Sequence, residues 1–195
     1  ATITLCEPTL EARELTANQV MKETGATFIH PYDHPGIIAG QGTVALELLE
    51  QVPDPGTVIV PVGGGGLVSG IALAFKEMWP STMVIAAEPT GADDAFRSRA
   101  AGRLIPQTGP QTVADGLRTS LGKHTWPVVR DVVADVWTVD DAAIMRAMRL
   151  LWERAKLVIE PSGAVGLAAL LAHRHRLPMN GTVAVVLSGG NVDLE

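Results

Sequence analysis

The chain has 195 residues, of which 47% are hydrophobic and 18% are charged, values typical of one or two compact domains and not of a disordered chain. Its net charge is −6 and its 15 lysine and arginine residues are scattered, which makes a nucleic-acid-binding surface a poor expectation. No stretch of 18 apolar residues is free of charges and of glycine or proline breaks, so we expect no membrane span.

Strand-like and helix-like segments alternate along the chain, which predicts an α/β fold with a parallel, twisted sheet flanked by helices. We expect strands at residues 3–6, 27–30, 57–61, 83–87, 136–139 and 182–187. We expect helices at residues 10–23, 37–51, 67–78, 94–101, 126–133, 140–156 and 163–175. Gly25 follows the first helix as a C′ residue would, and Thr138 with Asp141 resembles a capping box before the helix at 140–156.

Two irregular segments interrupt this alternation. Residues 31–36 contain two prolines and a glycine and are typical of a linker or hinge, whereas residues 104–116 form a long loop. A boundary near Tyr32 leaves one strand–helix–strand unit in front, which buries too little surface to be a domain by itself. The chain also opens without methionine, in a segment that reads as a strand already under way. We therefore expect it to be a piece of a longer polypeptide.

Four consecutive glycines, Gly63, Gly64, Gly65 and Gly66, stand between an expected strand and an expected helix. Glycine lets a ligand approach the main chain closely, and the first amides of a helix have no intrahelical partner and carry the positive end of its dipole. A tight corner needs fewer glycines, since each costs about 0.5–1 kcal/mol of backbone entropy relative to alanine. The pattern predicts a nest of N–H donors for a phosphate or carboxylate.

The neighbouring residues argue against the common nucleotide motifs. Val68 stands where G-x-G-x-x-G requires its third glycine, and Leu67 and Val68 stand where a Walker loop has Lys and Ser or Thr. No lysine or arginine occupies the turn, so amides and the helix terminus would hold the phosphate alone. Such an arrangement suits a cofactor phosphate that serves as an anchor and is not transferred.

A second glycine turn, Ser188-Gly189-Gly190-Asn191, follows the last expected strand, which by composition is a buried parallel strand. Ligands of open α/β sheets bind beyond the carboxyl ends of the strands. A Ser-Gly-Gly turn alone is more often a simple corner. Here a ligand-binding role for the turn is favoured, because both glycine turns follow the carboxyl ends of strands.

Five motifs occur in a recognisable order: Pro-Val-Gly-Gly-Gly-Gly-Leu at 61–67, Ala-Glu-Pro at 87–89, Val-Ala-Asp-Gly at 113–116, Ile-Glu-Pro-Ser-Gly-Ala at 159–164 and Leu-Ser-Gly-Gly-Asn-Val-Asp at 187–193. With Ile-Ala-Gly-Gln-Gly-Thr at 38–43, they resemble the fold type II pyridoxal-phosphate enzymes, in the group of serine racemases and serine/threonine dehydratases. The similarity covers essentially the whole chain. It implies the remainder of a small domain at residues 1–32 and an incomplete large, cofactor-binding domain at 33–195.

The resemblance also implies roles for single residues around pyridoxal 5′-phosphate. The phosphate would be held by Gly63, Gly64, Gly65, Gly66 and Leu67; Gly116 would pack against the cofactor and Asn191 would support the last turn. Ser188 would face the pyridine nitrogen. A neutral hydroxyl stabilises a protonated ring less well than a carboxylate, which favours reprotonation at Cα or loss of a β-hydroxyl over transamination.

Glu88 and Asp94 stand six residues apart around a Pro-Gly turn, and with a main-chain carbonyl between them they could converge on a hard cation. From spacing alone, a helix-capping role for Asp93 or Asp94 is the stronger interpretation. The resemblance points instead to the divalent-cation site of the serine racemases. The side chains of Glu88 and Asp94 and the carbonyl of Ala92 would then hold Mg²⁺ or Ca²⁺.

The activity implied by the resemblance is racemisation of serine, with β-elimination to pyruvate and ammonia. Serine or threonine would be the substrate, a nucleotide a further effector, and the assembly a homodimer. The family's Schiff-base lysine lies in an N-terminal segment that this chain does not contain, so we expect the isolated chain to be inactive until that segment is supplied. Two alternatives stay open: a threonine/serine dehydratase without racemase activity, and a catalytically silent anion-binding half that needs a partner chain.

Two residues of the first 32 carry separate expectations. Arg13 is in a helix start where an exposed surface arginine is the usual case, whereas the resemblance implies that it faces the substrate carboxylate. The single cysteine, Cys6, excludes an internal disulfide and suits a reducing compartment. We expect a cytoplasmic protein, with organelle targeting left open because the N-terminus looks incomplete.

Overall fold

The computed structural model describes residues 2–7, 9–178 and 181–193 of the chain, which divides into two compact units, Ala1–Pro31 and Tyr32–Glu195. The described residues of the first unit form one helix, α1 (Leu10–Thr24). The Thr9 hydroxyl accepts the N–H of Ala12 at its start, and Gly25, with φ +70°, ends it in the left-handed conformation as predicted. Residues 3–6 and 27–30, expected as strands, form no strand and pair with no other strand of the described residues. A β-branched run becomes a strand only where a neighbouring strand accepts its hydrogen bonds.

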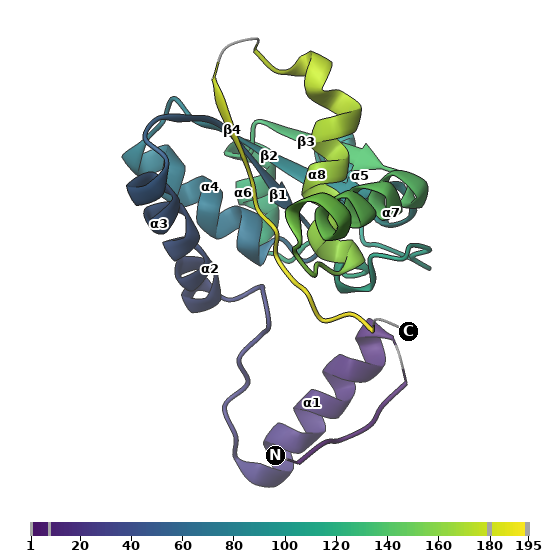
Figure 1. Cartoon of the computed structure of the whole chain (residues 1–195). Helices are drawn as coiled ribbons and strands as arrows, with labels where there is room; N and C mark the ends of the chain where they lie inside the picture. Colours follow the sequence, from purple (N-terminus) through teal and green to yellow (C-terminus); the bar gives the residue numbers. More distant parts are fainter. Residues whose placement is uncertain (1, 8, 179–180, 194–195) are drawn as a thin grey trace. The chain divides into compact units, whose positions relative to one another are not determined.

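The second unit is built on one parallel sheet in the order β3-β2-β1-β4 (Figure 1). Its strands are β1 (Pro55–Pro61), β2 (Met83–Pro89), β3 (Asp135–Val139) and β4 (Thr182–Val185). Its α-helices are α2 (Pro35–Gln41), α3 (Thr43–Gln51), α4 (Gly66–Met78), α5 (Asp94–Ala101), α6 (Thr125–Asp131), α7 (Asp141–Leu150) and α8 (Pro161–His173). Short 3₁₀ turns occur at Thr90–Ala92, Asp115–Leu117 and Arg174–Arg176, and a π-helical turn at Leu151–Ala155 extends α7. The predicted α/β class is confirmed.

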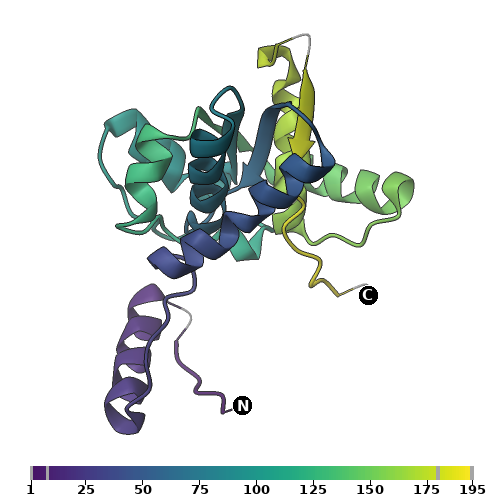
Figure 2. The same ribbon diagram turned by 90° about the vertical axis from the view of Figure 1, so that its left-hand side faces the viewer.

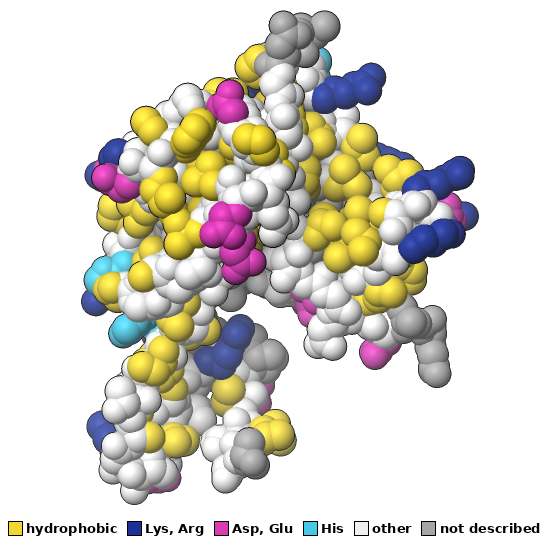
Figure 3. Space-filling view, turned by 60° about the vertical axis from the view of Figure 1, so that its left-hand side comes forward, with side chains coloured by type: hydrophobic (Ala, Val, Ile, Leu, Met, Phe, Trp, Pro, Cys, Tyr) yellow, Lys and Arg dark blue, Asp and Glu magenta, His cyan; other side chains and the backbone are white. Residues whose placement is uncertain are grey.

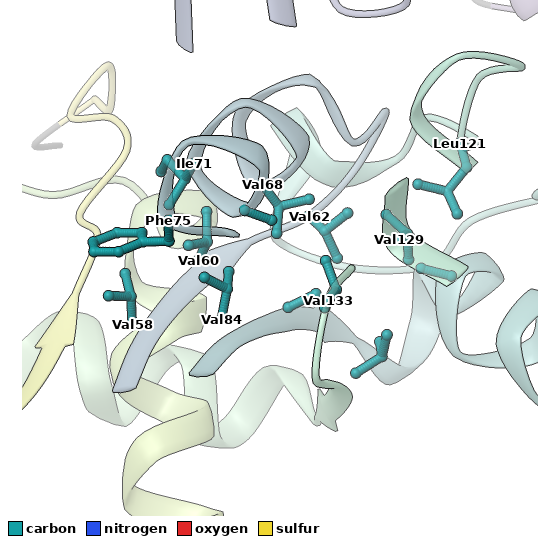
Figure 4. Packing of buried hydrophobic residues seen from close by; sticks show 14 of the residues in the cluster. Val58, Val60, Val62, Val68, Ile71, Phe75, Val84, Leu121, Val129 and Val133 are labelled. Carbon is teal, nitrogen blue, oxygen red and sulfur yellow. The ribbon is translucent and has the colours of Figure 1, made fainter. Parts of the chain in front are cut away.

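Alternate residues of the central strands face opposite helix layers. On one face, Val58 and Val60 of β1 and Val62 just after it pack against Val68, Ile71 and Phe75 of α4, and α6 completes this cluster (Figure 4). On the other face, Ile59 of β1 packs against α7 and α8. Figure 2 shows α4 and α6 on one side of the sheet and α7 on the other. These buried faces on both sides explain why β1 and β2 are nearly continuous apolar runs.

The expected helix at 37–51 is two helices, because Gly42 separates α2 from α3. A Cβ on Gly70 of α4 would lie 2.2 Å from the Ile38 carbonyl oxygen and 2.6 Å from the Gly42 nitrogen. This close approach of α4 to the α2–α3 junction is a contact between distant parts of the sequence, so local periodicity cannot reveal it.

Three other expectations need correction. The strand at 182–187 ends at Val185 and is half-exposed, because β4 lies at the edge of the four-stranded sheet and not inside it. The Asp140 side chain, not Thr138, caps α7 by accepting the N–H of Ala143. Residues 32–36 are not a free linker: His34 caps α2 through Nδ1, and Asp33 contacts the start of α6.

Hydrophobic side chains also remain at the surface of the second unit (Figure 3). A groove of about 450 Å³ runs between α2, α3, α4 and α6, and Ile38, Leu46, Leu73 and Val128 line it. None of the helices in the described residues combines the length and apolarity needed to cross a bilayer.

Candidate functional site

Both glycine turns lie at the same edge of the sheet. β1 and β4 are adjacent and parallel, so the loop after Pro61 and the loop after Val185 leave the sheet together (Figure 1). The N–H of Val186 donates to the carbonyl of Ile59 and extends this pairing toward the turn. This is the carboxyl edge, where ligands of open α/β sheets bind.

The four glycines of the first turn are held tightly by protein on their Cα side. A Cβ on Gly64 would lie 2.2 Å from the Tyr32 ring, and one on Gly66 would lie 2.9 Å from the Tyr32 carbonyl oxygen. A Cβ on Gly65, whose φ is +89°, would lie 2.8 Å from both Leu121 and Thr125. Packing and backbone conformation therefore account for glycine here without any ligand. The sequence argument that a structural corner cannot explain the run was wrong.

The amides of this turn provide the independent argument for an anion. The first helical hydrogen bond runs from Ser69 N–H to the Gly65 carbonyl. Within the described residues, the structure gives no protein acceptor for the N–H groups of residues 63–68, although all of these except half-buried Leu67 are buried. Buried amides ordinarily have partners. Together with the dipole of the 13-residue helix α4, they form a fit for an oxyanion.

Glu160 connects the second glycine turn to the rest of the site. Its N–H donates to the Gly189 carbonyl at 3.1 Å, and its Oε2 accepts the N–H of Asn191 at 2.9 Å. A Cβ on Gly189 would lie 2.6 Å from Glu160 Oε1, so a side chain here would displace the Glu160 carboxylate. The Ser188 side chain is exposed beside this network. Sequence reasoning placed Glu160 within a motif but gave it no role.

Gly116 lies between the two glycine turns. Its N–H donates to Ser162 Oγ at 3.0 Å, and its carbonyl oxygen would be 3.3 Å from a Cβ on Gly63. The structure therefore brings together Gly63, Gly116 and the turn held by Glu160. Leu67 follows directly, half-buried in the first turn of α4.

Glu88 and Asp94 form a separate buried pair at the carboxyl end of β2. Each side chain is 1% exposed, as is Ala92 between them. The Glu88 carboxylate accepts the N–H groups of Ala95 and Phe96 at 3.2 and 2.7 Å, so Glu88 caps α5. Asp93 occupies the N-cap position without a side-chain cap bond, and Asp94 Oδ2 instead accepts the N–H of Leu121 at 2.8 Å. The capping role expected for Asp93 or Asp94 belongs to Glu88.

Burial dominates the ionisation of this pair. Desolvation raises the pKa of Glu88 to about 8, although the Phe96 amide opposes the shift. Desolvation likewise raises the pKa of Asp94 to about 6, against the opposing hydrogen bond from Leu121. No cluster of three or more His, Cys, Asp or Glu side chains suited to a metal occurs among the described residues. Two carboxylates and one carbonyl are nevertheless the oxygen donors that a hard cation accepts.

The chain as a whole matches a known protein family. The family model described as pyridoxal-phosphate dependent enzyme matches residues 1–189. This chain belongs to that family. The serine racemase of Oryza sativa subsp. indica is 51% identical over 189 residues, which are 95% of this chain and 56% of the rice protein. The chain thus spans little more than half the length of the curated relatives that it matches.

Solved structures match the fold of this chain closely. Maize serine racemase matches with a TM-score of 0.95 at 50% identity, covering 100% of this chain and 60% of that one. A threonine deaminase from T.th. matches with a TM-score of 0.94 at 48% identity, covering 100% of this chain and 65% of that one. The predicted resemblance to serine racemases and dehydratases, and the fold type II architecture, are confirmed.

Pyridoxal phosphate carries a phosphate, an anion of the kind that amides without protein acceptors, such as those of residues 63–68, can bind. Arg13, in the first unit, is exposed on α1 and lines a hollow of about 400 Å³ together with Cys6. Tyr32 and Thr125, which contact the glycine turn, were missed by sequence reasoning. Only long-range contacts identify them, because neither stands in a motif with recognisable spacing.

Proposed function

We propose that this chain is the cofactor-phosphate-binding portion of a pyridoxal-phosphate-dependent serine racemase that also converts serine to pyruvate and ammonia. The observation that carries the proposal is the set of buried amides at residues 63–68 without protein acceptors. Support comes from the serine racemase relatives, of which this chain covers little more than half. A dehydratase acting on serine or threonine without racemising is the alternative, favoured by the threonine deaminase neighbour.

Pyridoxal phosphate, when bound, supplies the electron sink that stabilises negative charge at the substrate Cα. In the proposal, the amides of Gly63, Gly64, Gly65, Gly66 and Leu67 bind its phosphate dianion. Because no lysine or arginine stands in the turn, the grip is entirely main-chain and dipolar. Tyr32 and Leu121 pack against these glycines where a Cβ would stand, and so support the turn.

The second turn would hold the ring end of the cofactor. Ser188 offers a neutral hydroxyl to the pyridine nitrogen, and its exposed side chain leaves it available for that contact. Glu160 positions this turn by bonding to Gly189 and to the N–H of Asn191. In the proposal Gly116 packs close to the cofactor, and its own Cβ position is already closed by Ser162 Oγ at 3.0 Å. A neutral partner favours proton return to Cα or loss of the β-hydroxyl.

Residues 1–32 would belong to a small domain that carries Arg13 toward the substrate carboxylate, and residues 33–195 to the large domain. The lysine that anchors the cofactor would come from a segment outside this chain, so we propose that the chain alone is inactive. Homodimer formation is a further proposal, for which the apolar groove beside α2 and α3 offers a surface.

We also propose that Glu88, Asp94 and the Ala92 carbonyl hold Mg²⁺ or Ca²⁺. Support comes from the burial of both carboxylates, which makes their ionised forms costly unless a positive charge compensates them. Both already accept backbone N–H groups, but each carboxylate oxygen keeps further lone-pair capacity. Ligation here would fix the start of α5 against the loop at Leu121.

The test is complementation in solution. The 195-residue chain is purified alone and also co-expressed with the part of rice serine racemase that it does not match, and both are assayed with L-serine and pyridoxal phosphate. We expect D-serine and pyruvate only from the co-expressed sample. Turnover by the chain alone would refute the proposed inactivity, and pyruvate without D-serine would favour the dehydratase.

A binding experiment separates these enzymes from the catalytically silent alternative. The chain is titrated with pyridoxine 5′-phosphate and with pyridoxine, neither of which can react with a lysine. The proposal requires tighter binding of the phosphorylated compound. Equal affinities for the two compounds would refute the proposed phosphate site. Phosphate-dependent binding without any turnover after complementation would favour the catalytically silent anion-binding half.

A further inference from the structure

One peptide unit of the glycine turn is fixed by a side chain from a distant helix. The hydroxyl of Thr125, a fully buried residue at the start of α6, donates to the Gly64 carbonyl at 2.8 Å and accepts the N–H of Gly122 at 2.8 Å. All described peptide bonds are trans, so the N–H of Gly65 points opposite to the Gly64 carbonyl. The Gly65 amide is therefore directed away from Thr125.

Thr125 is itself held firmly. Its N–H donates to Asp33 Oδ1 at 3.2 Å, and the same carboxylate accepts the N–H groups of Lys123 and His124 at 3.0 and 2.8 Å. A Cβ on Gly122 would lie 2.1 Å from Asp33 Cγ, so the carboxylate packs directly on this backbone. These bonds to a single carboxylate fix the first residues of α6 and with them the Thr125 hydroxyl.

Tyr32 also contacts the turn: its ring packs against Gly64, and its main chain packs against Gly66. Both Tyr32 and Thr125 therefore restrict the turn. Glycine peptides rotate at little cost, so a free Gly64–Gly65 peptide could reverse and present its carbonyl oxygen to an anion. The hydrogen bond from Thr125 opposes that reversal.

We propose that Thr125 is a positioning residue for the cofactor phosphate: by holding the Gly64 carbonyl, its hydroxyl directs the Gly65 N–H toward the anion. This inference rests on the proposed phosphate cradle and adds a residue to it. Thr125 contacts no reacting group. Its contribution is preorganisation, since the donor geometry exists before the ligand binds.

The test compares Thr125→Val, which keeps the shape and removes the hydroxyl, with Thr125→Ser, which keeps the hydroxyl. Dissociation constants for pyridoxine 5′-phosphate and pyridoxine are measured by calorimetry on the full chain. We expect Thr125→Val to weaken binding of the phosphorylated compound about 3- to 10-fold, the effect of one lost hydrogen bond. Thr125→Ser should stay within about 2-fold, and pyridoxine binding should change in neither variant.

Thr82→Val is the matched control. Thr82 Oγ1 donates to the Pro55 carbonyl at 2.6 Å and is buried, but it lies at the amino end of the strands, away from the turn. Its loss should lower Tm about as much as the loss of the Thr125 hydroxyl while leaving phosphate affinity unchanged. Should Thr125→Val fail to fold, Thr125→Ser and Thr125→Ala make the same comparison.

A spectroscopic readout completes the test without any activity. Titration of the wild-type chain with inorganic phosphate should shift the Gly65 amide resonance, and Thr125→Val should reduce that shift whereas Thr82→Val should not. Equal phosphate affinity of Thr125→Val and Thr82→Val, with a wild type that prefers the phosphorylated compound, would overturn the inference alone. A wild type without that preference would overturn the cradle and the inference together.

Discussion

Replacing Glu88 by glutamine should make the protein more stable at alkaline pH and almost unchanged in weak acid. Glutamine has the shape of a protonated glutamate and can still accept one of the two N–H groups at the start of α5. It cannot ionise, so it never places a negative charge in this buried position. The comparison therefore isolates the cost of ionising Glu88, provided that a chelator removes divalent cations.

The magnitude follows from the pKa of Glu88, which burial raises from 4.5 to about 8. A raised pKa in the folded state gives stability that is fully present below pH 4.5 and is lost as the pH rises through about 8. Integration at 1.36 kcal/mol per pH unit gives a loss of about 4 kcal/mol at pH 8, of which less than about 1 kcal/mol is already lost at pH 5. Solvent screening does not reduce this free-energy loss, because Glu88 is only 1% exposed.

Urea unfolding followed by tryptophan fluorescence is the assay, since all four tryptophans lie in the second unit. With a slope of about 2 kcal/mol/M, the wild-type midpoint at pH 8 should fall about 2 M below that of Glu88→Gln, and the two should lie within about 0.5 M of each other at pH 5. A constant gap at both pH values, or a variant that is less stable at pH 8, would refute the reasoning. Added Mg²⁺ should rescue the wild type alone if the proposed cation site exists.

Three other substitutions test the packing around the site. Ser69→Ala should raise the free energy of unfolding by about 1 kcal/mol, because the Ser69 hydroxyl is fully buried and has no partner in the described structure; a loss of stability in urea titration would point to an unseen bond. Gly65→Ala should lower the free energy of unfolding by about 1–3 kcal/mol more than Gly102→Ala does, because both glycines have positive φ but only a side chain at position 65 would also clash. Equal losses of stability in the two variants would show that the turn has room for a Cβ. Asp33→Ala should lower stability by about 1–2 kcal/mol, measured as a Tm decrease that Asp33→Asn largely restores, because asparagine also caps helices; an unchanged Tm would mean that water replaces the carboxylate.

Much of the fold follows from local pattern. The sequence predicts strands β1, β2 and β3 and the helix at 94–101 closely. Both burial on two faces and helix periodicity are visible in the pattern of neighbouring residues. The two strands expected in the first unit failed, because a strand depends on a partner that its own residues do not specify. The prediction of a single helix at 37–51 failed for a related reason, because the break at Gly42 depends on the contact with Gly70 of another helix.

The candidate site divides in the same way. Its glycine turns were predictable because the glycines are consecutive and follow strands. The residues that hold those turns were not, since Glu160 acts across 31 positions and Thr125 across 61. The reason for glycine was also misjudged, because a sequence shows that side chains are absent but not what fills the space.

The half-exposed strand β4 has a practical consequence for handling the protein. Its only neighbour in the described sheet is β1, so one side of an alanine- and valine-rich ribbon keeps backbone groups free to recruit another extended peptide. Concentrated samples should therefore be prone to strand pairing between molecules and to precipitation. A solvent-facing lysine on this strand would reduce that tendency.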